Sequence, residues 1–115
     1  MKRFPSIKKN ADFQTVYKKG KSVANRRLVM YVMKRGAGES RIGISVSKKV
    51  GNSVVRHRCV RLIRECFRLN RDILQTGLDI VIVVRPAAAG DEYHAMERAF
   101  LHLCGTQGIL MKELK

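Results

Sequence analysis

The segment 54–68, VVRHRCVRLIRECFR, constrains the fold more than any other part of this 115-residue chain. Successive residues of a helix are about 100° apart around its axis. On such a helix, one set of apolar side chains from this segment and the residue after it lies within about 40° of a single line along the helix surface. These side chains are Val55, Cys59, Leu62, Cys66 and Leu69. The spacing predicts a helix over 53–70 with an apolar stripe that the rest of the chain must cover.

Basic side chains form a second line on the far side of this helix: His57, Arg61, Arg64 and Arg68. Arg56 and Arg58 lie between the apolar line and this basic line. Glu65 is the one acid within the helix, so the stacked cations repel one another by a few tenths of a kcal/mol per pair. Guanidinium groups bind phosphate in a fork and release counterions from nucleic acid. The alternative is a basic face that contacts only solvent, but the shortage of acids on the helix favours a polyanionic ligand.

The charge distribution of the whole chain agrees with this interpretation. Residues 1–71 hold 20 Lys and Arg against 3 acids, whereas residues 72–115 hold 4 against 6, within a net charge of +15. Charge that served only solubility would be spread over the surface, so the segregation predicts a phosphate-binding surface. Nucleic acid is therefore the expected partner.

The remaining patterns predict one α+β domain over 1–115. A short helix over 11–20 is expected after Asn10 as its cap, strands over 26–34 and 41–47 as an antiparallel hairpin, a buried strand over 79–85, and a last helix over 91–104. The order α-β-β-α-β-α favours a single-domain two-layer sandwich with a small mixed sheet. One crossover connection is needed, and its handedness does not follow from the pattern.

The predicted strand over 41–47 has a face of small residues, Gly43, Ser45 and Ser47, that leaves room for a ligand. Phe13 and Tyr17 share one side of the first helix, and Tyr31 lies on the strand face opposite Leu28, Met30 and Val32. Such rings can stack unpaired bases, at about 1–3 kcal/mol each. Aromatic residues at helical spacing are more often part of a core, and both interpretations stay open.

The residues just before the central helix extend the basic surface. Lys48, Lys49 and Gly51 lead to Asn52, next to the free backbone N–H groups that favour anions at a helix N-terminus.

No motif for protein-borne catalysis is present, because HExxH, GxxxxGK and GxSxG are all missing. We expect no catalytic and no metal-binding residues. Three cysteines without a CxxC pair are typical of a reducing cytoplasm, and the longest apolar run, 80–84, is too short to cross a membrane. We therefore expect a cytoplasmic protein without a membrane partner.

Two segments carry a family resemblance: SRIGISVSKKVGNSVVRHRCVRLIRECFR and, before it, KKNADFQTVYKKGKSVANRRLVMYV. The chain resembles the protein subunit of bacterial ribonuclease P over nearly its whole length. The resemblance implies an RNA-binding domain with a left-handed βαβ crossover, of the ribosomal protein S5 domain 2-like type. It also implies a subunit that pairs with ribonuclease P RNA and helps to remove the 5′ leader from precursor tRNA, while the RNA and its bound Mg²⁺ carry the hydrolysis.

Carried over by position, the leader-contacting residues are Phe13, Tyr17, Tyr31, Ser45 and Ser47. The residues facing RNA are Lys48, Lys49, Asn52, Arg56, His57, Arg58, Arg61, Arg64 and Arg68. Two positions depart from the family pattern: His57 replaces the asparagine of an Arg-Asn-Arg triplet, and Val60 stands where lysine is common. Residues 1–9 are left open as a segment that is flexible until RNA binds.

Three other functions compete with this interpretation. A ribosome-associated RNA-binding protein without a nuclease role is the main alternative. A DNA-binding helix is less expected, because only His57 among the arginines could read base edges. A membrane-surface helix is disfavoured, since the apolar stripe is needed for the core.

Overall fold

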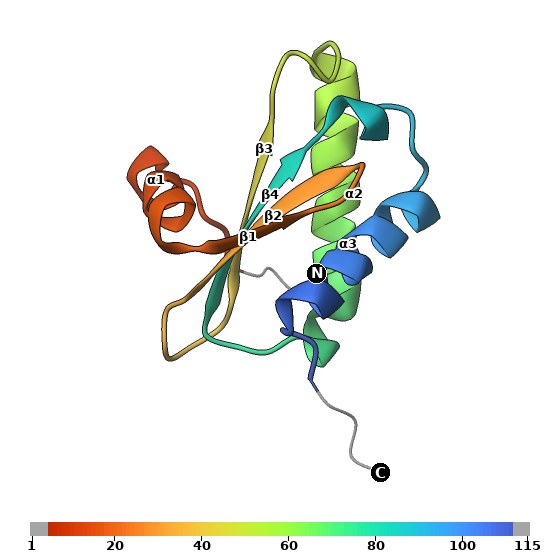
Figure 1. The fold of residues 1–115 in the computed structure, drawn as a ribbon. Coiled ribbons are helices and arrows are strands. Elements are labelled where there is room, and N and C mark those ends of the chain that lie inside the picture. Colours follow the sequence, from red (N-terminus) through yellow and green to blue (C-terminus); the bar gives the residue numbers. More distant parts are fainter. Residues whose placement is uncertain (1–4, 112–115) are drawn as a thin grey trace.

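The computed structural model describes residues 5–111, which form three α-helices and one four-stranded sheet (Figure 1). The elements in chain order are α1 (Asn10–Lys19), β1 (Lys21–Ala24), β2 (Leu28–Lys34), β3 (Arg41–Val46), α2 (Ser53–Asn70), β4 (Leu78–Val84) and α3 (Tyr93–Gln107). Short 3-10 helices follow α2 and β4, at Arg71–Ile73 and Pro86–Ala88. The predicted bounds of the central helix are confirmed.

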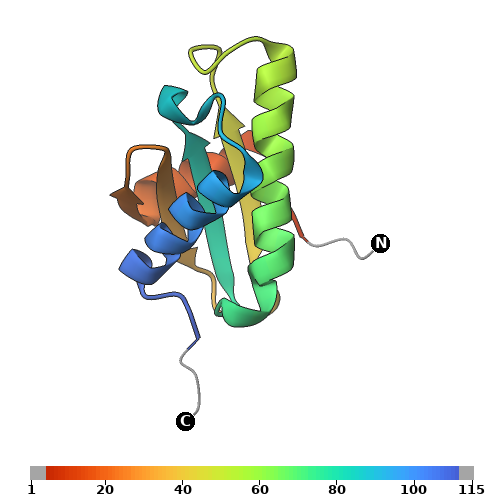
Figure 2. The same cartoon turned by 90° about the vertical axis from the view of Figure 1, so that its right-hand side faces the viewer.

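The sheet has the strand order β1-β2-β4-β3. β2 is antiparallel to both β1 and β4, whereas β3 is parallel to β4. In Figure 2, β3 and β4 both point upwards, β4 lies to the left of β3, and α2 connects them on the viewer's side of the sheet. The β3-α2-β4 crossover is therefore left-handed.

The predicted hairpin of the second and third strands is wrong. β4 lies between β2 and β3, and its pattern of burial explains why: six of its seven residues are buried. A strand whose side chains are buried on both faces of the sheet is typical of an interior strand, which has a hydrogen-bonded neighbour along each of its edges. The edge strand β1 was also missed, since only Val23 of its four residues is even half-buried.

Helices cover both faces of the sheet, as Figures 1 and 2 show. The main core lies between the sheet and the α2–α3 pair, where Ile63, Phe67 and Phe100 are fully buried. This part matches the predicted two layers. On the other face, α1 adds a smaller layer over Ile7, Val16 and Val81.

The buried face of α2 is rotated about the helix axis relative to the predicted apolar stripe. Cys59 and Cys66 are buried as expected, but Ile63 and Phe67 complete the buried face, and Leu69 is 53% exposed. The reason is that α2 packs against both β3 and α3, so a wider and rotated face is covered. The side chain of Asn52 caps the helix by accepting a hydrogen bond from the N–H of Val55 at 3.0 Å. The cap predicted for α1 is wrong, because Asn10 is its first helical residue and Lys9 precedes it.

Residues 5–9 run along the outer edge of β3. Ser6 forms a parallel bridge with Ile42, and the N–H of Ile7 donates to the Ile42 carbonyl at 2.8 Å. Ile7 is buried against the α1 side of the sheet. The proposed flexible segment 1–9 thus includes a described part that pairs with β3, while residues 1–4 lie outside the described residues.

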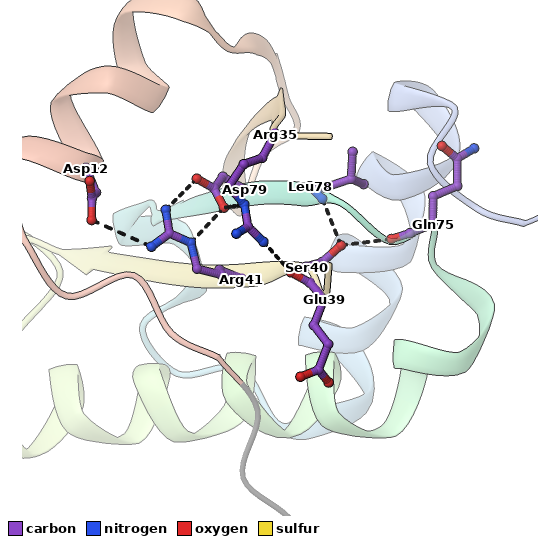
Figure 3. A network of polar contacts seen from close by, with 8 residues as sticks. All are labelled: Asp12, Arg35, Glu39, Ser40, Arg41, Gln75, Leu78 and Asp79. Atoms are coloured by element: carbon purple, nitrogen blue, oxygen red, sulfur yellow. Dashed lines mark hydrogen bonds and ion pairs between the residues drawn. The ribbon is translucent and has the colours of Figure 1, made fainter. Parts of the chain in front are cut away.

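A buried carboxylate fixes one end of the sheet beneath α1 (Figure 3). Asp79 is 1% exposed and accepts two hydrogen bonds from Arg41, at 2.9 and 2.7 Å, while Arg35 lies 3.2 Å away. A further nitrogen of Arg41 lies 3.6 Å from the carboxylate of Asp12 on α1. The bond to Asp79 raises the pKa of Arg41. This network connects α1 to the two strands below it.

Candidate nucleic-acid interface

Three rings from α1 and β2 form an aromatic cluster, defined as Phe13, Tyr17 and Tyr31. The rings of Tyr17 and Tyr31 meet edge to face with centroids 4.9 Å apart, and Phe13 lies 6.3 Å from Tyr17 in a tilted arrangement. All three are partly exposed and pack around the small core under α1. The core interpretation is thus confirmed for the buried parts of the rings, while base stacking on their exposed parts stays a prediction.

The space beside Gly43 is filled by the chain itself. A Cβ atom placed at Gly43 would lie 2.8 Å from the Phe13 ring and 3.0 Å from Ile7. The prediction that this space is open to a ligand is therefore wrong, because glycine is needed there for Phe13 to lie against the sheet. Ser45 stands half-exposed further along the same strand, and Ser47 is exposed just beyond it.

The predicted basic residues of α2 and its lead-in lie on the side that faces away from the core. Arg56 is partly buried, and the exposed basic residues are Lys48, Lys49, His57, Arg58, Arg61, Arg64 and Arg68; the neutral Asn52 is exposed beside them. The structure brings them together on one helix and the loop before it. Their assignment to RNA contact stays a prediction.

The arginines of α2 differ in how far they are already engaged. Arg68 makes a two-pronged ion pair with Glu65, at 2.8 and 2.6 Å, and this pairing lowers the pKa of Glu65. Arg64 donates to the hydroxyl of Ser6 at 3.1 Å. Arg61, by contrast, makes no hydrogen bond or ion pair with the residues from 5 to 111 and is exposed. Of these three arginines, Arg61 is therefore the one whose charge is open to a ligand.

The basic side of α2 and the aromatic cluster lie on opposite faces of the sheet and approach each other around the β3 edge. Residues 5–9 make the connection: Ser6 contacts Arg64, and Ile7 packs under α1. Lys8 and Lys9 are exposed between them.

Neither a cluster of metal-binding side chains nor an exposed cysteine is found among residues 5–111. Among residues 5–111, no group of three or more His, Cys, Asp or Glu side chains is placed to share a metal ion. The three cysteines are buried and unpaired, and burial raises the pKa of Cys66 and of Cys104 to about 12, so both thiols stay protonated at neutral pH.

The three α-helices of residues 5–111 differ from membrane-spanning helices. None of them combines the length and the apolar character required to cross one.

Sequence reasoning missed two groups of residues. Arg41 and Asp79 form the buried ion pair. The sequence feature that could have predicted this pair is the lone acid, Asp79, near the start of an otherwise apolar strand. Arg27 and Arg58 both bond to Asp91 just before α3, and Arg85 donates to the main-chain oxygen of Asn25. Their signal was weak, because Arg27 and Arg85 are separated by 58 positions in the sequence.

Comparisons with known proteins agree on one family. A family model described as Ribonuclease P matches residues 1–107. The ribonuclease P protein component of Lachnoclostridium phytofermentans is 54% identical over 105 residues, which cover 91% of this chain and 90% of that protein.

Solved structures give the same result. The RNase P protein of Staphylococcus aureus is 38% identical with a TM-score of 0.85, over 94% of this chain and 99% of that one. The RNase P protein of Thermotoga maritima is 29% identical with a TM-score of 0.82, over 90% and 97% of the two chains. Since the match covers nearly the full length in sequence and in fold, this chain belongs to the ribonuclease P protein family.

Proposed function

We propose that this chain acts in the cytoplasm as the protein subunit of a bacterial ribonuclease P, binding the catalytic RNA and the 5′ leader of precursor tRNA. The observation that carries the proposal is a set of features on a member of this family: exposed cations on α2, exposed lysines beside the β3 edge, and partly exposed rings under α1. Each part suits a different feature of RNA. Guanidinium groups suit the phosphates of folded RNA, and the rings suit unstacked bases.

The division of labour follows from the chemistry of the side chains. The basic side of α2, with Lys48 and Lys49 before it, holds the catalytic RNA. The aromatic cluster, with Ser45 and Ser47 nearby, holds the leader, which is single-stranded and has bases free to stack. Hydrolysis is assigned to the RNA and to Mg²⁺ ions held mainly by that RNA, and the protein contributes binding and orientation.

Reconstitution is the direct test. The purified chain is mixed with a bacterial ribonuclease P RNA at low Mg²⁺ concentration, and cleavage of a precursor tRNA is followed over time. Cleavage should be faster with the chain than without it, because the added cations reduce repulsion between RNA and substrate. No acceleration at any Mg²⁺ concentration would contradict the proposal.

A ribosome-associated role is distinguished in the same experiment. A protein that served the ribosome alone would bind ribosomal RNA as tightly as ribonuclease P RNA and would leave the cleavage rate unchanged. Competition with purified ribosomal RNA at equal nucleotide concentration separates the two functions.

A further inference from the structure

Arg41 bonds to two carboxylates that belong to different layers of the fold (Figure 3). Its Nε and Nη2 atoms donate to the two oxygens of Asp79 at 2.9 and 2.7 Å, and its Nη1 atom lies 3.6 Å from the carboxylate of Asp12. Asp79 is buried in the central strand β4, whereas Asp12 lies in the first turn of α1 with its side chain 39% exposed. The planar guanidinium group of Arg41 thus connects the centre of the sheet to the N-terminal end of α1.

The N-terminal end of α1 has few other anchors. Among the ten residues of the helix only Val16 is buried, and the residue before the helix provides no side-chain cap. A single residue joins the C-terminal end of α1 to β1, so that end is fixed by the chain itself. At the N-terminal end an apolar anchor is Phe13, whose ring lies over Gly43. The pair of Asp12 and Arg41 adds a polar link beside this contact.

This link lies next to the residues that carry the aromatic cluster. Asp12 directly precedes Phe13, and Tyr17 follows four residues later on the same side of the helix. The third ring, Tyr31, lies on β2 and meets Tyr17 edge to face, with 4.9 Å between the centroids. Two rings therefore move with α1 while the third stays with the sheet. A shift of α1 over the sheet would separate the rings, and the bond between Asp12 and Arg41 opposes that shift.

We propose that Asp12 is a positioning residue for the leader of precursor tRNA. Through Arg41, Asp12 holds α1 where its two rings and Tyr31 together receive unpaired bases. The inference rests on the proposed function, because it concerns the site assigned there to the leader. Asp12 itself does not touch the RNA, since its negative charge repels phosphate. An exposed ion pair shifts an equilibrium between two positions of α1 by at most about fivefold, which sets the size of the effect.

The test uses holoenzyme reconstituted from the full-length chain and a bacterial ribonuclease P RNA. The quantity measured is the ratio of its affinities for precursor tRNA and for mature tRNA. Asp12→Asn should lower this ratio about two- to fivefold, because the ion pair with Arg41 is lost. Asp12→Glu keeps the carboxylate and should stay close to the wild-type ratio.

The sign of the change separates positioning from simple electrostatics. Removing a negative charge from an RNA-binding protein should by itself tighten the binding of both RNAs, so a loss confined to the precursor indicates positioning. Glu92→Gln is the matched control, since Glu92 is an exposed acid just before α3, on the face of the sheet opposite α1. This control variant should leave the ratio unchanged.

Arg41→Lys tests the same ion pair from its other partner. One ammonium group cannot keep the forked bond to Asp79 and also reach Asp12, so the ratio should fall as it does for Asp12→Asn. The double variant should fall no further, because both changes break one interaction. A wild-type ratio for Asp12→Asn, or additive losses in the double variant, would overturn the inference. Tyr17→Ala tests the proposed function separately, since a ratio that this variant leaves unchanged would refute leader binding by the aromatic cluster itself.

Discussion

Two groups of arginines in this molecule have opposite surroundings. Arg35 and Arg41 lie against the buried carboxylate of Asp79, and Arg41 also approaches Asp12, so their charges are compensated. Arg61, on the outer side of α2, has no such partner among residues 5–111. Net charge alone therefore does not locate a binding surface. The position of the few acids decides which cations hold the fold together and which face a ligand.

The largest effect is expected at the compensated group. Asp79→Ala should lower the free energy of unfolding by about 3 kcal/mol, because two arginines lose a buried partner, although both are exposed enough to turn towards water. Chemical denaturation measures the change. Asp12→Asn is the matched control, and since Asp12 is 39% exposed it should cost less than about 1 kcal/mol. Equal losses for the two variants would mean that the burial of Asp79 has no special role.

The aromatic cluster gives the next largest effect. Tyr17→Ala should weaken binding of precursor tRNA by about 1–3 kcal/mol, the value of one stacked base, and should leave mature tRNA binding nearly unchanged. Tyr17 suits this test better than Phe13, because Phe13 also covers Gly43. Tyr17→Phe keeps the ring and serves as the control. Similar losses for precursor and mature tRNA would show that the ring serves folding alone.

Two exposed arginines on the outer side of α2 are tested by removing their charge. Arg61→Ala with Arg64→Ala should reduce the salt slope of RNA binding by about 1.4–1.8, at 0.7–0.9 per phosphate contact. The unfolding free energy should change little, because surface substitutions usually stay within about 0.5 kcal/mol each. Glu65→Ala with Arg68→Ala removes a pair with no net charge, and an unchanged slope is expected. A slope reduced as much by this neutral pair would break the comparison.

The smallest effect concerns an acid held by neutral donors. Hydrogen bonds from Asn70 and Tyr93 lower the pKa of Glu97 in the folded state. A lowered folded pKa means that the contribution to stability is present above the unfolded value of about 4.3. It is lost as the pH falls through the folded value. Glu97→Gln should therefore flatten the acid limb of a stability curve measured below about pH 5.

Much of the interface could be predicted from the sequence because its signals are local. The spacing of the arginines on one side of 53–70 follows from helix geometry alone, and the structure places them away from the core. The opposite orientation of Tyr31 and Met30 follows from strand alternation and is confirmed by their separate clusters. The role predicted for Gly43 was wrong, because a small residue indicates that another group lies close to it but does not identify that group.

By itself, the sequence determined the central helix, the excess of cations on its outer side, and the family to which the chain is similar, because each depends on residues close together or on a pattern of the whole chain. Only the tertiary structure decided that β4 separates β2 from β3, that Asp79 takes Arg41 and Arg35, and that Arg27 and Arg58 both bond to Asp91. The physical reason is that strand pairing and ion pairing depend on distance in space, and periodicity along the chain carries no information about it.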